Sequence, residues 1–220
     1  MKRREFLTVP VKSLGGLLLF TLAGEPVRFA KQGNAKVRIP LLFFTEAEAR
    51  IVQAACARIF PSDENGPGAT EANVIVYIDR QLAGPWGEDK YRYTQAPWVE
   101  SVPEHGYQAK DNPRQIYRAA IPKLGADYTS VPPTEQDARL RAIERSTFFR
   151  ILRTHTLEGM FSDPLHGGNA GLIGWQLIGY PGPLMSYRDE IDKYHGLPFQ
   201  AKPKSLEQVT GRKVRGWEEE

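Results

Sequence analysis

Helix signals recur along this chain, and no alternating pattern of the kind that predicts β-strands recurs with them. Four stretches open on residues that typically cap a helix: Thr45 with Glu48, Asn112-Pro113, Thr134 with Asp137, and Ser146 or Thr147. The segment from Thr70 to Leu82 could be a buried strand, but its length and the spacing of Val74, Ile78 and Leu82 favour a helix. Ser186 predicts a short further helix to about Tyr194. We therefore expect an all-α fold.

Long connections separate these helices, because the chain holds 17 Pro and 20 Gly. The longest runs from Gly84 to Asn112, and a loop of that length usually has a function or packs against another part of the structure. We expect an irregular helical domain with Pro-, Gly- and aromatic-rich loops and an extended polar C-terminal tail. The predicted division is 1–24 as an export signal, 25–44 as a linker, 45–195 as the helical domain and 196–220 as the tail.

The N-terminus carries a twin-arginine export motif, in which Arg3 and Arg4 are followed by Phe6 and Leu7. A short apolar stretch follows over 13–24, below the roughly 20 residues that a membrane-spanning helix needs. The motif predicts export in the folded state. Cleavage after Ala23 and retention of the signal as a tether both remain open.

Positive charge gathers near the N-terminus. Residues 1–38 hold eight Lys and Arg and two acidic residues, which leaves 21 basic and 24 acidic residues for the rest of the chain. A nucleic-acid-binding body would carry excess positive charge, so that class is not expected. The single cysteine, Cys56, excludes an intramolecular disulfide and a cysteine-held iron–sulfur cluster, and its alanine-rich surroundings predict a small buried apolar residue.

The four histidines are the first candidates for catalysis or metal binding. His155 lies at helical spacing from apolar residues, which is typical of a hydrogen-bonded core histidine. His166 opens the turn His166-Gly167-Gly168-Asn169, which we interpret as a tight chain reversal that needs positive φ. His105 and His195 lie in loop contexts and are expected at the surface. A metal site around His155 and His166 is the alternative, although neither spacing nor neighbouring carboxylates form a metal motif.

Aromatic residues are unusually frequent in the predicted loops: Trp86, Tyr91, Tyr93, Trp98, Tyr107 and Tyr180. Interface cores are enriched in Trp and Tyr, so the rings could form a partner surface. They could equally pack the loops onto the helices, and the sequence leaves both possibilities open.

Several motifs together resemble a known family. They are Asp79-Arg80-Gln81-Leu82 with Gly84-Pro85-Trp86 and Tyr91-Arg92, then Gly106-Tyr107-Gln108 with Ile116-Tyr117-Arg118, and finally Phe161-Ser162-Asp163-Pro164-Leu165-His166-Gly167-Gly168-Asn169 with Gly174-Trp175 and Ile178-Gly179-Tyr180-Pro181-Gly182. From about Thr45 to Pro183 the chain resembles the small subunit, subunit 3, of membrane-bound gluconate 2-dehydrogenase and related FAD-dependent sugar and polyol dehydrogenases. That family usually has Tyr where this chain has His166.

The resemblance implies a non-catalytic accessory subunit with no cofactor of its own. In such complexes FAD is held by a large dehydrogenase subunit, and haem c by a multihaem cytochrome subunit. The small subunit carries the export signal, so its partners would be both subunits and the twin-arginine translocase, in the periplasm at the inner membrane. Its candidate contact residues are Trp86, Tyr91, Trp98, Tyr107, His166, Asn169, Trp175 and Tyr180. A stand-alone exported enzyme with a histidine-based site, and a structural subunit anchored by an uncut signal, are the alternatives.

Overall fold

The structure, a computed structural model, describes residues 13–14, 17–22, 25–28, 40–92, 96, 98, 110–184, 186, 188, 193 and 202–211. The chain divides into two units, 1–40 and 41–220. In the first unit, strands β1 (Ser13–Leu14), β2 (Leu17–Leu22) and β3 (Glu25–Arg28) pair antiparallel in chain order. The predicted export motif at residues 3–7 lies outside the described residues.

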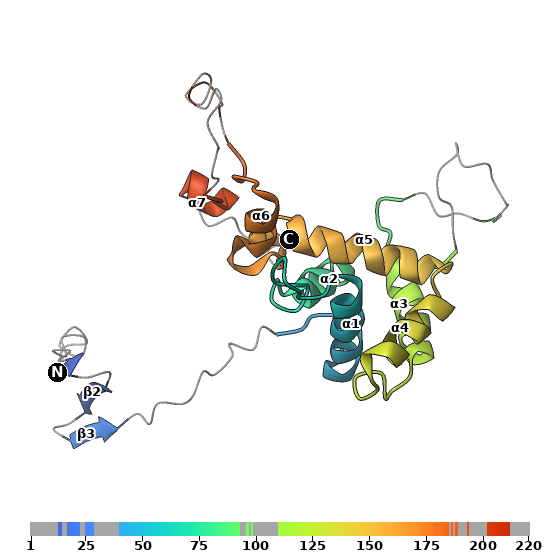
Figure 1. Ribbon diagram of the computed structural model, residues 1–220, viewed down its shortest axis with the longest axis horizontal. Coiled ribbons are helices and arrows are strands. Elements are labelled where there is room, and N and C mark those ends of the chain that lie inside the picture. The colour runs from blue at the N-terminus through green and yellow to red at the C-terminus, as the bar shows by residue number, and fades with distance from the viewer. Residues whose placement is uncertain are drawn as a thin grey trace. The chain divides into compact units, whose positions relative to one another are not determined.

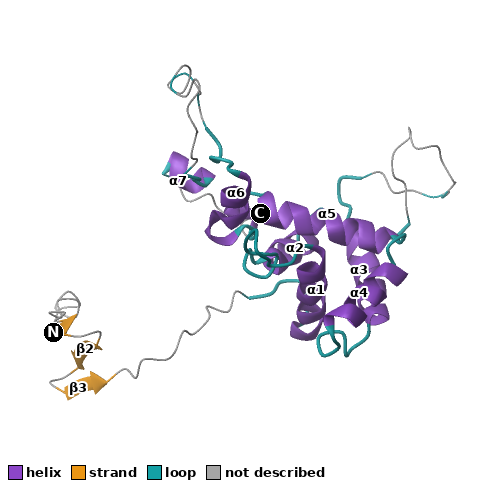
Figure 2. Ribbon diagram, viewed as in Figure 1, coloured by secondary structure: helices purple, strands orange, loops and turns teal. Residues whose placement is uncertain are grey.

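The second unit is helical, as Figure 2 shows, and this confirms the all-α prediction for the body of the chain. Its α-helices are α1 (Glu46–Ile59), α2 (Val74–Ala83), α3 (Pro113–Leu124), α4 (Pro133–Ala142), α5 (Thr147–Phe161), α6 (Ile173–Ile178) and α7 (Leu206–Thr210). Two 3₁₀ turns, η3 (Pro164–His166) and η4 (Ala170–Leu172), connect α5 to α6.

Local capping explains where three of these helices begin. Thr45 Oγ1 accepts the Glu48 N–H at 3.3 Å while the Glu48 carboxylate accepts the Thr45 N–H at 2.9 Å, so the predicted capping box of α1 is confirmed. At α3, Asn112 and Gln115 form the same reciprocal pair. The Ser146 hydroxyl accepts the third N–H of α5. Each box satisfies backbone donors that the helix itself cannot.

The predicted start of α4 was wrong. The helix begins at Pro133 after Pro132, and neither Thr134 nor Asp137 caps it. Two successive prolines set the backbone for a first turn without needing a side-chain cap, because their φ is already helical. The Asp137 carboxylate instead accepts two hydrogen bonds from Arg58 of α1, at 2.7 and 2.9 Å. It therefore joins α4 to α1.

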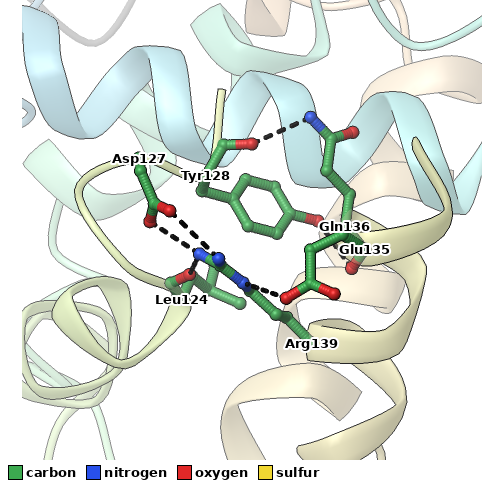
Figure 3. A network of polar contacts seen from close by, with 6 residues as sticks. All are labelled: Leu124, Asp127, Tyr128, Glu135, Gln136 and Arg139. Atoms are coloured by element: carbon green, nitrogen blue, oxygen red, sulfur yellow. Dashed lines mark hydrogen bonds and ion pairs between the residues drawn. The ribbon is translucent and has the colours of Figure 1, made fainter. Parts of the chain in front are cut away.

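A polar network closes the α3–α4 connection (Figure 3). The Arg139 guanidinium donates to both oxygens of Asp127 at 2.7 and 3.0 Å and to the carbonyl that ends α3, while its Nε donates to Glu135. The Gln136 amide donates to the Tyr128 carbonyl at 2.9 Å, and the Tyr128 hydroxyl donates back to the Gln136 carbonyl. These bonds fix the turn between α3 and α4, which the sequence predicts only as a connection between two helices.

The core lies where α5 packs against α1, α2, α3 and α6, with α1 also packing on α2, α3 and α4 (Figure 1). Among its fully buried side chains are Val52, Ile78, Leu82 and Leu152. Burying each of them contributes about 2 kcal/mol. Cys56 is 1% exposed in the same core, which confirms its prediction as a small buried residue, and burial raises the pKa of its thiol to about 12.

The glycine-rich turn after α5 is a site of very close backbone approach. Gly167 has φ +100°, which confirms the predicted reversal with positive φ. A Cβ on Gly168 would lie 2.2 Å from the carbonyl oxygen of Gly159, and one on Gly174 would lie 1.9 Å from that of Met160. Only glycine leaves room for the chain to fold back onto the end of α5.

The described part of the C-terminal tail contains a helix that the sequence analysis did not predict. Ser205 and Gln208 form a capping box at the start of α7, and the Leu206 N–H donates to Asp163 at 2.7 Å. This bond fastens α7 to the residue that precedes η3. The helix expected over 186–194 lies mostly outside the described residues.

Candidate functional site

A buried carboxylate fixes the entry of the chain into the helical body. Asp79 on α2 is 1% exposed and accepts the backbone N–H groups of Leu42, Phe43 and Phe44 at 2.6, 3.0 and 2.8 Å. Three charge-assisted hydrogen bonds compensate for burying the charge. The position could have been inferred from the sequence, because an acidic residue within an otherwise apolar helix must be partnered.

An arginine holds the turn that follows α2. Arg114 on α3 donates to the carbonyls of Leu82 and Ala83 and pairs with Glu88. The turn is tight: a Cβ on Gly87 would lie 2.1 Å from the Leu82 carbonyl oxygen. Residues 84–92 are therefore presented on a fixed backbone, and these are the residues that carry the first aromatic side chains of the long loop.

Three adjoining hollows line the surface next to this turn. The first, which we call the Trp86 pocket, has a volume of about 420 Å³, and its walls include Arg80, Gln81, Pro85, Trp86, Lys90 and Tyr91. The second has a volume of about 500 Å³ and reaches α5 at His155 and Glu158, and the third, of about 450 Å³, ends at His166. Gln81 lines all three, so together they form one groove along α2 and α5.

His155 forms the inner wall of the second hollow. Its side chain is 3% exposed, its Nδ1 shares a 2.8 Å hydrogen bond with the Tyr117 hydroxyl, and the Tyr117 ring stacks on it. The prediction of a hydrogen-bonded core histidine is confirmed. Trp86 covers the imidazole from outside, edge-on, with ring centroids 4.6 Å apart. Burial lowers the pKa of His155 to about 4, so the imidazole is neutral at neutral pH.

A second polar pair separates the second hollow from the third. The Tyr77 hydroxyl donates to Glu158 at 2.9 Å, and burial, reinforced by the carboxylate charge, raises the pKa of Tyr77. His155 lies on one side of this pair and His166 on the other. Over the described residues, no group of three or more His, Cys, Asp or Glu is placed to hold a metal ion. The groove combines the polar side chains of His155, Glu158 and His166 with the aromatic rings that line it.

Four of the eight predicted contact residues carry exposed rings: Trp86 (42%), Tyr91 (81%), Trp98 (38%) and Tyr180 (39%). The aromatic loop residues are therefore divided between the two interpretations, since Trp86 also packs on the core histidine while Tyr91 faces solvent. His166 is half-buried at the end of the groove. Tyr107 lies outside the described residues, as do His105 and His195.

The other two predicted contact residues are buried inside the chain. Asn169 is fully buried, and its side chain donates to the Ser162 carbonyl at 2.9 Å and accepts the Gly174 N–H at 2.8 Å. Trp175 is 4% exposed and donates its indole N–H to the Phe161 carbonyl at 2.6 Å. These side chains tie α6 to the end of α5.

Apolar side chains are also exposed at and after the end of α6: Leu177, Ile178, Tyr180 and Leu184. We call them the α6 patch. The Tyr180 ring packs edge-on against Trp175, with ring centroids 5.0 Å apart. In the part of the chain that the structure covers, no helix is long and apolar enough to cross a bilayer.

One family model, described as gluconate 2-dehydrogenase subunit 3, matches residues 46–182. The match starts at α1 and ends after α6, and it includes Asp79, the residues named above as walls of the groove, and the glycine-rich turn. No curated protein and no solved structure matches the chain.

Proposed function

Since the chain belongs to the gluconate 2-dehydrogenase subunit 3 family, we propose that it is the accessory subunit of a periplasmic, FAD-dependent sugar or sugar-acid dehydrogenase. In this proposal a large flavoprotein subunit holds FAD and oxidises the substrate. A multihaem c-type cytochrome subunit then carries the electrons to the inner membrane. This chain binds the flavoprotein, supports its maturation and brings it to the export machinery. The family match over more than half of the chain is the observation that carries the proposal.

The N-terminal motif supports the export role. Arg3-Arg4 followed by Phe6-Leu7 is typical of the twin-arginine route, which moves folded proteins. A flavoprotein acquires FAD when it folds, so a holoenzyme made in the cytoplasm must cross the membrane folded. A signal on one tightly bound subunit can then serve both chains.

The exposed aromatic groove supports the binding role. Stable protein interfaces are anchored by Trp, Tyr and Arg side chains in preformed hollows. Trp86 and Tyr91 stand on a turn that Arg114 and Gly87 hold in place, and the groove beside them extends along two packed helices. A rigid aromatic surface loses little conformational entropy when it binds a partner.

The export role is tested by changing both arginines of the motif. We expect the Arg3→Lys, Arg4→Lys double variant, co-expressed with the flavoprotein subunit, to leave both chains in the cytoplasm with FAD bound. The matched control is Arg28→Lys, a conservative change outside the motif. Flavoprotein that reaches the periplasm in the same amount with the double variant would refute the escort role. Failure of the two chains to co-purify would refute the accessory role altogether.

A signal that remains as an anchor is a separable version of this proposal. N-terminal sequencing of the mature chain distinguishes the two: a start after Ala23 indicates a removed signal, and an intact start indicates a tether. The escort role is compatible with either.

A further inference from the structure

The Trp86 pocket has the size and composition of a site for a large side chain. Its volume is about 420 Å³, within the range of specific binding pockets, and Pro85, Trp86 and Tyr91 contribute apolar surface to it. The Tyr91 ring is 81% exposed although it lies on a turn that is otherwise well anchored. A largely exposed aromatic ring beside a hollow is characteristic of a binding surface.

Two cations at this pocket are not neutralised by the described residues. Asp89 is paired with Arg92, so these two charges compensate each other. The Arg80 guanidinium, by contrast, makes no ion pair or hydrogen bond with the described residues. Lys90 Nζ lies 5.7 Å from the centre of the Tyr91 ring and has no carboxylate partner among the same residues. Among the residues that the structure describes, the pocket therefore combines apolar walls with two positive charges that have no carboxylate partner.

The Arg80 side chain is also held in position. Its Cδ lies 3.1 Å from the point where a Cβ on Gly167 would stand, so its stem packs against the glycine-rich turn. Arginine is suited to this role because its planar guanidinium can bind both oxygens of a carboxylate. A stem fixed by packing reduces the entropy lost when the carboxylate binds.

We propose that the Trp86 pocket binds an acidic, extended segment of the flavoprotein subunit. One apolar or aromatic side chain of that segment enters between Trp86 and Tyr91, and a neighbouring Asp or Glu pairs with Arg80 and Lys90. The segment continues into the second hollow, which shares Gln81 and other walls with the pocket. This inference rests on the proposed function and assigns the partner's chemistry at one surface.

The first test is photo-cross-linking in the purified complex. A benzophenone amino acid replaces Tyr91 in one variant and Arg141, an exposed residue of α4, in the control. We expect the probe at position 91 to cross-link to the flavoprotein, and mass spectrometry to place the link in a segment rich in Asp or Glu. The control position should give no such product.

The second test measures the affinity of the purified chain for the flavoprotein. Arg80→Glu and Trp86→Ala should each weaken binding by about 10-fold or more, as loss of an anchor residue does. Arg80→Lys should restore most of the affinity, because it keeps the charge and much of the stem. Arg50→Glu, a charge reversal on an exposed part of α1, should stay within about 2-fold of the unmodified chain. Circular dichroism verifies that each variant is folded.

Three results would overturn the assignment. Wild-type affinity of folded Arg80→Glu and Trp86→Ala would do so, and so would loss of binding on Ile178→Ala in the α6 patch with the pocket variants unaffected. The third is a cross-link from position 91 to residues 216–220 of the same chain, whose Trp217 and three glutamates offer the same chemistry. In all three cases co-purification of the unmodified chains still supports the accessory role, and its absence refutes that role.

Discussion

Replacing His155 by glutamine should remove a large part of the acid sensitivity of this fold. In the folded chain the imidazole is 3% exposed and burial lowers its pKa from 6.5 to about 4. Between these values the unfolded chain binds a proton that the folded chain does not. The free energy of unfolding therefore falls as the pH drops from about 6.5 to about 4. Below that range this group changes it no further, because both states are then protonated.

The size of the effect follows from the same two values. One pKa unit corresponds to about 1.4 kcal/mol, so the complete loss is roughly 3 kcal/mol, of which about 2 kcal/mol has been lost at pH 5. In a domain of this length, that loss lowers the melting temperature by about 4–8 °C. His155→Gln should be less stable than the unmodified chain at pH 8, because it loses the stacking with Tyr117 and part of the contact with Trp86.

The assay is the free energy of unfolding in urea, measured at several pH values between 8 and 5 for both proteins. All other ionisable groups are the same in the two proteins, so the difference between the two curves isolates His155. We expect that difference to shrink by about 2 kcal/mol from pH 8 to pH 5. Parallel curves would refute the reasoning, as would an NMR titration of the His155 ring with a midpoint near 6.5.

Three further substitutions test the packing of the helical body. Gly174→Ala places a Cβ 1.9 Å from a carbonyl oxygen of α5 and should lower the free energy of unfolding, measured in urea, by about 3 kcal/mol or more. In the control Gly84→Ala the nearest atom to the new Cβ is 3.4 Å away, so the same free energy should change by about 1 kcal/mol at most. Asp79→Ala leaves three backbone N–H groups without their acceptor and should lower the free energy of unfolding by about 3 kcal/mol. Hydrogen exchange should become faster at residues 42–44 in particular, whereas a general loss of stability would affect the whole domain. Trp175→Phe loses one hydrogen bond to the end of α5 and should lower the melting temperature by a few degrees, and an unchanged value would contradict the role given to the indole N–H.

Local signals predicted the fold well because helix caps depend on neighbouring residues. The capping box at Thr45 and the cap at Ser146 each depend on hydrogen bonds to a residue only three positions further along the chain. The Thr134–Asp137 prediction failed for the opposite reason: Asp137 bonds to Arg58, which lies 79 positions earlier. No local pattern contains that information.

The ambiguity over α2 has a physical origin. Val74, Ile78 and Leu82 are fully buried, but Ile75 and Val76 on other sides of the helix are buried too. A helix enclosed on most sides has a continuous apolar sequence, and such a sequence resembles a buried strand. Length decided correctly in favour of the helix.

The candidate site was predictable only in part. Aromatic frequency pointed to Trp86 and Tyr91, which do lie at a hollow. It could not separate them from Trp175, whose burial depends on how the glycine-rich turn brings α6 against α5. The role proposed for Arg80 could not be inferred from the sequence either, because whether a charge is paired is visible only once the neighbouring side chains are placed.

The three hydrogen bonds to Asp79 have a mechanical consequence. They bind residues 42–44, which open the helical body and follow the predicted export segment in the chain. If the chain is exported as proposed, a pull on its N-terminus would act on these bonds and reach α2 through a single carboxylate. They can form only after α2 has folded, since Asp79 lies in the second turn of that helix. Residues 42–44 are thus fastened to α2 only when that helix has already formed.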